Sequence, residues 1–109
     1  MAYKLEMEAL VLSALESGPL HGYRIGQSIK VRSQGLLKLG DNQIYPTLHR
    51  LELEGFICAE WQPQEGKPSR KVYSLTESGH GRLAERRKEL EKYIAAFSTA
   101  MGLPGAQNA

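Results

Sequence analysis

The sequence has little of what secreted and membrane proteins use. It contains one cysteine, Cys58, which cannot form a disulfide within the chain. Its first residues, Met1–Glu6, lack the basic and then apolar run of a signal peptide. No apolar run approaches the ~20 residues needed to span a bilayer. We therefore expect a cytoplasmic protein with no membrane partner.

The sequence also lacks the residue patterns of catalytic and metal sites. No ordered set of Ser, His and Asp, no carboxylate pair and no glycine-rich loop after a strand indicates catalysis. The three histidines, His21, His49 and His80, are far apart in sequence, and with Cys58 they match no metal-ligand spacing. A chain of 109 residues forms one small domain without a deep enclosed pocket. These absences predict a protein that is not an enzyme and has no cofactor or metal.

Positive charge is concentrated in two segments, although the formal net charge is only +2. Residues 24–50 contain five basic residues against one acidic residue, and residues 63–71 contain three against one. Most acidic residues lie elsewhere. Two separated basic segments in one small domain favour a polyanionic partner. Charge alone does not distinguish nucleic acid from an anionic membrane surface.

Residues 41–52 are the stretch around which we interpret the rest of the chain. Ile44, Leu48 and Leu51 recur at helical spacing and predict one buried face, and Asp41 is a good N-cap. The residues left outward or at the margins are Asn42, Gln43, Pro46, Thr47, His49 and Arg50. Pro46 must lie in or just past the first turn, because it lacks an amide hydrogen. Amide and guanidinium groups can read base edges, so this helix is either a DNA-recognition helix or an ordinary solvated helix.

Two helices are predicted before this stretch. Residues 5–16 form a helix with apolar residues on two sides. One side carries Leu5, Ala9 and Leu12, and the other carries Met7, Leu10, Val11, Ala14 and Leu15. One core needs only one side, so the second stripe predicts a partner subunit. A second helix opens at residues 20–23 and runs to about residue 33, and Gly22 and Gly26 share one of its faces, which permits close packing against a neighbouring helix.

Three strands are predicted around the candidate recognition helix. Residues 34–40 are too short and glycine-bounded for a helix, so we expect a brief strand there. Residues 57–62 alternate between apolar and polar side chains, which predicts a half-buried strand, and residues 71–75 form another. Residues 63–69 between them are polar and rich in turn-forming residues. The predicted product is a hairpin with a basic tip.

A long final helix is predicted after Thr76, which caps it. Leu83, Leu90, Ile94, Phe97 and Met101 follow at intervals that form a seam for packing against another helix. Gly79 and Gly81 weaken the start of this helix by about 1 kcal/mol each relative to alanine. The predicted organisation is a DNA-binding domain over residues 1–75, a dimerisation helix over residues 76–101 and a flexible tail over residues 102–109.

This outline predicts a mainly α fold with a small β-hairpin: a winged helix-turn-helix plus a long C-terminal dimerisation helix. Three ordered motifs carry a more specific resemblance. They are Gly18-Pro19-Leu20-His21-Gly22-Tyr23, then Ile44-Tyr45-Pro46-Thr47-Leu48-His49-Arg50-Leu51-Glu52-Leu53-Glu54-Gly55, and then Tyr73-Ser74-Leu75-Thr76-Glu77-Ser78-Gly79. From about Leu10 to Leu83 the chain closely resembles the PadR family of bacterial transcriptional regulators, in its small branch with a single C-terminal helix.

The resemblance implies a homodimeric repressor that binds a double-stranded DNA operator. It implies that the third helix enters the major groove, that the wing tip approaches the minor groove or the backbone, and that a small ligand releases many members. The wing reads Gly66-Lys67-Pro68-Ser69-Arg70-Lys71, where family members often carry a longer arginine run, so phosphate contact is favoured over minor-groove insertion.

The expected DNA contacts come from three parts of the chain. The recognition helix contributes Asn42, Gln43, Tyr45, Thr47, His49 and Arg50. The start of helix two contributes His21, Tyr23 and Arg24, and the wing contributes Lys67, Ser69, Arg70 and Lys71. We expect Arg50 and Gln43 to discriminate between sequences, and Lys67, Arg70 and Lys71 to add affinity with little choice of base. The Tyr45 ring is expected in the core, with its hydroxyl within reach of a phosphate. The expected dimer interface comprises Leu5, Leu12, Leu83, Leu90, Ile94, Phe97 and Met101.

Two alternatives from other functional classes remain open. Trp61, Tyr93 and Phe97 could line a cavity at the dimer interface for a small aromatic or hydrophobic effector, in a dimer whose main role is sensing or sequestration. Plain core packing is the competing interpretation, and we favour it for Trp61. A winged helix that binds only protein is the other alternative, against which the uncancelled basic charge argues. Only the DNA-binding interpretation requires a steep salt dependence of binding to a duplex.

Overall fold

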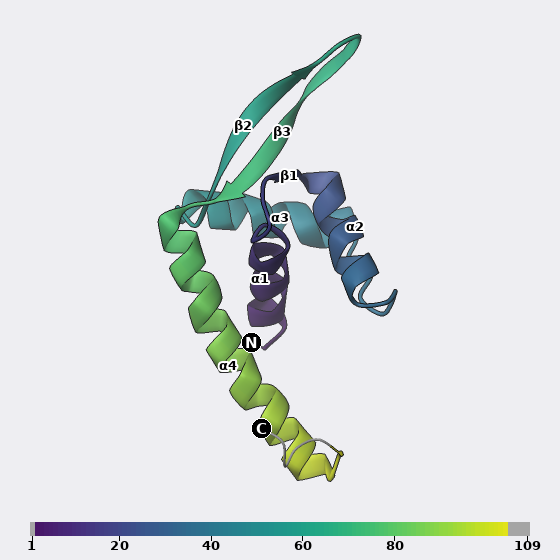
Figure 1. The fold of residues 1–109 in the computed structure, drawn as a ribbon, viewed down its shortest axis with the longest axis vertical. Coiled ribbons are helices and arrows are strands. Elements are labelled where there is room, and N and C mark those ends of the chain that lie inside the picture. The colour runs from purple at the N-terminus through teal and green to yellow at the C-terminus, as the bar shows by residue number, and fades with distance from the viewer. Residues whose placement is uncertain (1, 105–109) are drawn as a thin grey trace.

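The structure is a computed structural model that describes the backbone of residues 2–104 and the side chains of residues 6–104. Its elements are α1 (Ala2–Ala14), β1 (Leu20–His21), α2 (Gly22–Arg32), α3 (Asp41–Leu53), β2 (Ile57–Gln64), β3 (Lys67–Leu75) and α4 (Glu77–Met101). Figure 1 shows α1, α2 and α3 packed together, with the hairpin of β2 and β3 rising on one side and α4 extending on the other. The predicted mainly α architecture with a small hairpin is confirmed.

Helix α1 is the central helix of the core and packs against α2, α3 and α4. Both of its apolar sides are therefore covered within one chain. Its buried apolar residues are Met7, Ala9, Val11, Leu12, Ala14 and Leu15. The prediction that the second stripe needs a partner subunit is wrong, because three neighbouring helices surround α1. Leu12 is fully buried and offers no surface to a partner, and the side chain of Leu5 lies outside the described residues.

Helices α2 and α3 approach each other through two glycines, as the sequence predicts. A Cβ atom at Gly22 would lie 2.7 Å from the Tyr45 ring, and one at Gly26 would lie 2.8 Å from Cδ1 of Ile44. Both distances are too short for carbon atoms in contact, so the Tyr45 ring or the end of the Ile44 side chain would have to move to admit a side chain at these positions. The close approach places the start of α2 beside the outer face of α3.

The predicted strand at residues 34–40 is wrong. Gln34 and Gly35 have positive φ angles, Leu36 is exposed, and the segment is a loop at the end of α2 that is remote from the sheet (Figure 1). The third strand is instead β1, which pairs antiparallel with β3. A strand needs a partner with free backbone groups. The edge of β3 offers such groups to Leu20–His21. Helix α2 consequently begins at Gly22.

The sheet has the order β1-β3-β2, and the hairpin strands are longer than predicted. Strands β2 and β3 pair from Ile57 with Leu75 out to Gln64 with Lys67, so the polar segment expected as a loop is mostly strand. Gly66, with φ +70°, allows the tight turn. A register shift between Gln62 and Gln64 accommodates Pro63 on the edge strand, where its missing amide disrupts pairing least.

Helix α4 is anchored at its start and exposed along its far half. Thr76 is its N-cap, as predicted, and its Oγ1 accepts from the Gly79 amide at 3.1 Å. Leu83 is 2% exposed and packs into the domain core, so its assignment to a dimer seam is wrong. The reason is that the first half of α4 lies against α1. Gly102 ends the helix in a left-handed conformation.

Candidate nucleic-acid interface

The start of α3 differs from the prediction in its capping residue. Gly40, not Asp41, is the N-cap, with extended backbone angles, and Asp41 is the first helical residue. The Gly40 amide donates to Oε1 of Gln43 at 3.1 Å, which satisfies a backbone group before the first turn. Asp41 remains exposed at the positive end of the helix dipole, a favourable place for a carboxylate. Pro46 lies just past the first turn, as predicted.

The buried face of α3 is wider than the predicted stripe. Ile44, Leu48 and Leu51 are buried, which confirms the stripe. Thr47 is also buried, at 9% exposure, and its hydroxyl donates to the Gln43 carbonyl at 2.9 Å. The prediction that Thr47 faces outward is therefore wrong. It lies one turn from both Ile44 and Leu51, so it belongs to the same packed side of the helix.

Arg50 points into the molecule instead of outward, which corrects a second prediction. Its Nη1 lies 3.1 Å from Oε1 of Glu8 on α1 and 3.2 Å from Oε1 of Glu54 on α3. The Glu8 carboxylate is 4% exposed, so the guanidinium is drawn toward the core. The sequence signal for this contact is a single carboxylate inside the apolar run of α1, which periodicity alone assigns to no face.

The outward stripe of α3 consists of Asn42, Tyr45, Pro46 and His49, all of which are exposed. Their spacing of three and four residues places them along one side of the helix. The Tyr45 ring packs against Gly22 of α2, but 44% of the residue is exposed, so the expected place of the ring in the core is wrong. Gln43 is half-buried beside this stripe.

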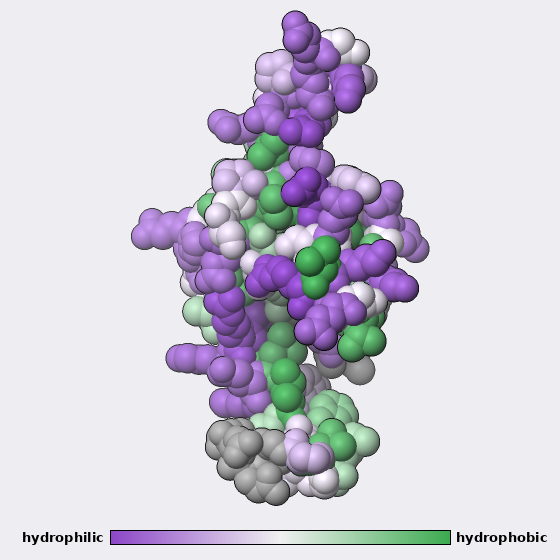
Figure 2. Space-filling view, turned by 45° about the vertical axis from the view of Figure 1, so that its right-hand side comes forward, coloured by the Kyte–Doolittle hydropathy of each residue, from purple (hydrophilic) through white to green (hydrophobic). Residues whose placement is uncertain are grey.

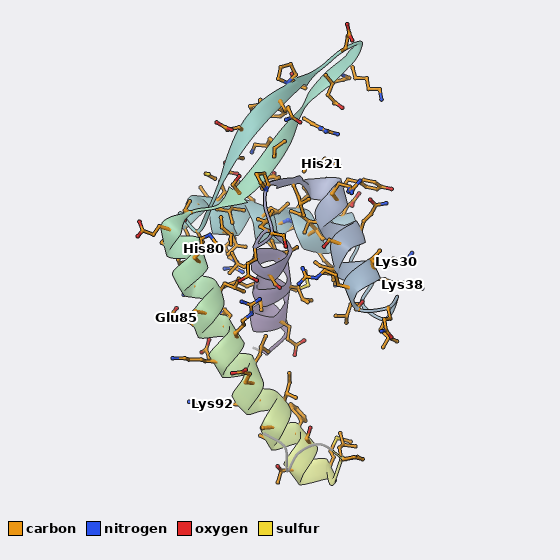
Figure 3. All side chains as sticks on the ribbon, in the orientation of Figure 1. His21, Lys30, Lys38, His80, Glu85 and Lys92 are labelled. Atoms are coloured by element: carbon orange, nitrogen blue, oxygen red, sulfur yellow. The ribbon has the colours of Figure 1, made fainter. Side chains whose placement is uncertain are left out.

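The start of α2 brings a second group of side chains to this stripe. His21 lies in β1, opposite Val72 of β3 (Figure 3). Its ring stacks on that of Tyr23, with centroids 6.3 Å apart. Burial, and the nearby cations of Arg70 and Arg24, lower the pKa of His21 below its ordinary value of 6.5. Arg70 of the wing and Arg24 of α2 therefore both place positive charge near His21.

The wing contributes exposed cations near its tip and a bound cation near its base. Lys67, Ser69 and Arg70 are exposed, and Nε of Arg70 donates to Oε1 of Gln62 at 3.4 Å. Lys71 instead lies 3.3 Å from Oε1 of Glu52 on α3. The amino group of Lys71 is also 5.9 Å from the centre of the Trp61 ring. Lys71 therefore ties the wing to α3, a role that the sequence analysis missed.

The start of α2, the outward stripe of α3 and the wing adjoin one another, because Tyr45 packs against Gly22 and Lys71 pairs with Glu52. We name their exposed residues the contact face. It comprises Tyr23, Arg24, Asn42, Tyr45, His49, Lys67 and Arg70, together with half-buried His21. Figure 3 places Lys30 and Lys38 at the other end of α2 from His21. The basic segment of residues 24–50 is thus divided, and only part of it reaches the contact face. A count of charges along the sequence does not show this division, because it ignores at which end of α2 each residue lies.

The three residues expected to line an effector cavity do not come together within the chain. Trp61 lies on β2 in the wing, whereas Tyr93 and Phe97 lie on the far half of α4 (Figure 1). Two open hollows lie against α2, and none of the three residues lines either of them. Within one chain the three residues line no common cavity, because the hairpin and α4 extend in opposite directions. The core packing that we favoured for Trp61 is wrong, because 66% of this residue is exposed.

The part of the chain that the structure describes contains no cluster of three or more His, Cys, Asp or Glu side chains able to hold a metal ion. The histidines lie on separate elements, and Figure 3 shows His80 on α4, away from His21. Among the described residues, no helix is both long enough and apolar enough to cross a membrane.

Comparisons with known proteins agree on one family. Residues 11–85 match the model of the transcriptional regulator PadR-like family. The chain is 39% identical over 72 residues to the transcriptional regulator Rv3488 of Mycobacterium tuberculosis, which covers 66% of this chain and 53% of that protein. It is 38% identical over 69 residues to the negative transcriptional regulator PadR of Bacillus subtilis, covering 63% of this chain and 38% of that protein. The chain thus spans about half or less of the length of these curated relatives.

Solved structures confirm the winged-helix fold. A transcriptional regulator from Clostridium thermocellum matches with a TM-score of 0.81 and 21% identity over 90% of this chain and 92% of that chain. The structure of Bacillus subtilis PadR in complex with operator DNA matches with a TM-score of 0.68 and 34% identity over 73% of this chain and 45% of that chain. The structure of that relative therefore contains its operator DNA.

Proposed function

Because the chain belongs to the transcriptional regulator PadR-like family, we propose that it is a homodimeric repressor that binds operator DNA through the contact face. The observation that carries this proposal is the convergence of α2, α3 and the wing on one surface that holds Arg24, Lys67 and Arg70. Within the described residues, none of these three cations forms an ion pair within the fold, so their charge is available to phosphates.

Different residues of the contact face serve position and sequence choice. Arginine and lysine bind phosphates and set register, whereas amide and imidazole groups on a helix in the major groove reach base edges. Asn42 and His49 lie on the outward stripe of α3 and are the proposed readers. Arg50 and Lys71, which are held by Glu8 and Glu52, have structural roles first.

The far half of α4 supports the proposed dimer. Ile94, Phe97 and Met101 are at least 60% exposed, and half-buried Leu90 continues the same side of the helix. Figure 2 shows hydrophobic side chains gathered at the lower end of the molecule, where α4 ends. A second copy with the same stripe would remove this apolar surface from water, which is the usual driving force for helix pairing.

We propose that a small effector releases the DNA by binding between the two α4 helices of the dimer. Tyr93 and Phe97 have ring centroids 5.8 Å apart at an angle of 40°, and both are exposed in the single chain. In a dimer they would flank the interface, where a planar hydrophobic compound could change the spacing of the two chains. Trp61 does not belong to this proposed pocket.

The salt dependence of duplex binding tests the proposed function. The full chain is used to select duplexes from a random pool, and the affinity for an enriched duplex is then measured at several salt concentrations. Arg24, Lys67 and Arg70 of two chains would make about six phosphate contacts. The logarithm of the affinity would then fall with a slope of about −5 against the logarithm of the salt concentration. No enrichment together with a flat slope would favour a protein-binding winged helix instead.

A further inference from the structure

Glu8 is a buried carboxylate that plays no part in the contact face or in the proposed dimer interface. It lies between Met7 and Ala9 in α1, and its side chain is 4% exposed. A carboxylate in such a place is strongly destabilising unless cations and hydrogen bonds compensate it. Three arginines from two other helices do so here.

The two oxygens of Glu8 bind different helices. Oε1 accepts from Nη1 of Arg50 on α3 at 3.1 Å. Oε2 accepts from Nε of Arg82 at 2.5 Å and from Nε of Arg86 at 2.7 Å, both on α4. One carboxylate on the central helix therefore joins the candidate recognition helix to the candidate dimer helix.

The cluster around Glu8 is electrically balanced. Glu54 on α3 pairs with Arg50, and Glu89 on α4 pairs with Arg86, so three carboxylates face three guanidinium groups. Burial acts to raise the pKa of Glu8, but hydrogen bonds from Arg82, Arg50 and Arg86 outweigh it and hold the pKa below 4.5. Glu8 is thus charged under ordinary conditions and binds both helices at once.

We infer that Glu8 is a positioning residue, which sets the orientation of α3 relative to α4 and so the spacing of the two recognition helices in the dimer. This inference rests on the proposed function. Two half-sites lie about 34 Å apart on one face of a duplex, so a small rotation of α3 on α4 displaces a recognition helix from its groove. Binding to a single half-site does not depend on that rotation.

An ion pair between α4 and the turn that follows α1 supplies a matched control. The Arg87 guanidinium binds both oxygens of Glu16, at 2.6 and 2.9 Å. This pair is exposed and does not include α3. Glu16→Gln therefore removes a carboxylate that joins the turn after α1 to α4 while leaving the link to α3 intact. Glu8→Gln instead removes the charge from the group that binds both α3 and α4.

The first test measures the orientation of α3 without DNA. Cys58 is exposed, so Cys58→Ser is the background in which His49→Cys on α3 and Lys92→Cys on α4 carry nitroxide labels. The labelled chain is diluted with unlabelled chain, so that the distance within one chain is measured by electron resonance. The distance distribution should broaden or shift in Glu8→Gln and stay unchanged in Glu16→Gln. An unchanged distribution in Glu8→Gln overturns the inference.

The second test measures binding to duplexes enriched from a random pool by the wild-type chain, cut to contain two half-sites or one. Glu8→Gln should weaken binding to two half-sites by about twofold to thirtyfold, and binding to one half-site by less than about twofold. Glu16→Gln should change neither. An equal loss on both duplexes would mean that Glu8 supports only the fold or only α3, and would overturn the inference.

Arg50→Gln keeps the tests decisive if Glu8→Gln does not fold. It cuts the link from Oε1 to α3 but leaves Glu8 paired with Arg82 and Arg86, so no buried charge loses all its partners. It should reproduce both effects. If Arg50 instead reads a base, Arg50→Gln lowers binding to one half-site as well. If the wild-type chain enriches no duplex, the proposed function fails, and the label distances still judge the inference.

Discussion

At the scale of single residues, Gly79 is the position where a side chain fits least. A Cβ atom there would lie 2.0 Å from the Phe56 carbonyl oxygen and 3.2 Å from Cδ2 of Leu75. The first contact is with backbone, which cannot move aside as a flexible side chain can. Gly79 has a low helix propensity, but its lack of a side chain lets α4 begin against the turn after α3.

We predict that Gly79→Ala destabilises the fold by about 1 to 3 kcal/mol or more, the usual cost of overpacking. Gly81→Ala is the control, because nothing lies within 4 Å of its Cβ position. It should stabilise the helix by about 0.5 to 1 kcal/mol, since alanine favours helix more than glycine does. Denaturant unfolding of both variants measures the difference. Equal effects of the same sign would contradict the proposed close contact.

His21 gives the contact face a dependence on pH. Its pKa is lowered in the free protein by burial and by Arg70 and Arg24, so the folded protein loses stability as the pH falls below 6.5 through the lower folded value. A phosphate beside His21 would raise its pKa again, because the anion favours the charged ring. DNA binding should then take up a proton and become tighter as the pH falls.

We predict that the affinity for an enriched duplex rises between about pH 7.5 and about pH 5.5, and that His21→Gln reduces this rise. Fluorescence anisotropy at constant ionic strength measures it. His80→Gln is the control, because His80 lies on α4 and away from the contact face (Figure 3). A pH dependence that His21→Gln leaves intact would show that another group takes up the proton.

At the scale of elements, the outward stripe of α3 and the tip of the wing should contribute differently to binding. Asn42→Ala should narrow the difference between operator and random duplex by about 1 to 3 kcal/mol, if its amide pairs with a base. Arg70→Ala should weaken both duplexes alike and reduce the salt slope by about 1. Titrations of both variants at several salt concentrations separate the two roles. Equal proportional losses on both duplexes in both variants would refute this division.

At the scale of the whole molecule, the far half of α4 leaves the body of the domain and exposes an apolar stripe. The molecule is 55 Å long but only 28 Å and 23 Å across, and this extension together with the hairpin at the opposite end accounts for the elongated shape (Figure 1). The seam that we propose is reduced to Leu90, Ile94, Phe97 and Met101, because Leu83 is buried in the core. A rigid extension of this kind can hold two recognition helices at a set distance.

We predict that Ile94→Asp separates the chains and lowers operator affinity far more than helix content. Ile94 is 63% exposed in the single chain, so the acid costs little in the monomer but would be buried in the dimer at several kcal/mol per ion. Sedimentation, circular dichroism and a gel shift measure the three quantities. Lys92→Asp is the control, because it changes the charge more but lies on the opposite side of α4. A stable Ile94→Asp dimer, or a monomer with wild-type affinity for the operator, would refute the proposed role of the seam.

The sequence by itself determined the features that depend on neighbours along the chain. The buried stripe of Ile44, Leu48 and Leu51 follows from helical period, and the Thr76 cap follows from the chemistry of its hydroxyl. The close approach of α2 and α3 was predictable from Gly22 and Gly26, because two glycines four residues apart leave a gap on one face. The hairpin followed from alternation and a turn-rich segment. All of these signals lie within a few residues of the structure that they specify.

Only the tertiary structure decided which surfaces remain exposed. Arg50 turns inward because Glu8, 42 residues earlier, lies buried beside it, and Lys71 is held by Glu52 on another element. Leu12 and Leu83 are core residues because α1 is enclosed by three helices, which no periodicity along α1 or α4 reveals. The third strand forms at Leu20–His21 because β3 offers a free edge there. Burial and ion pairing depend on contacts between elements that are remote in sequence, so local pattern alone cannot assign them.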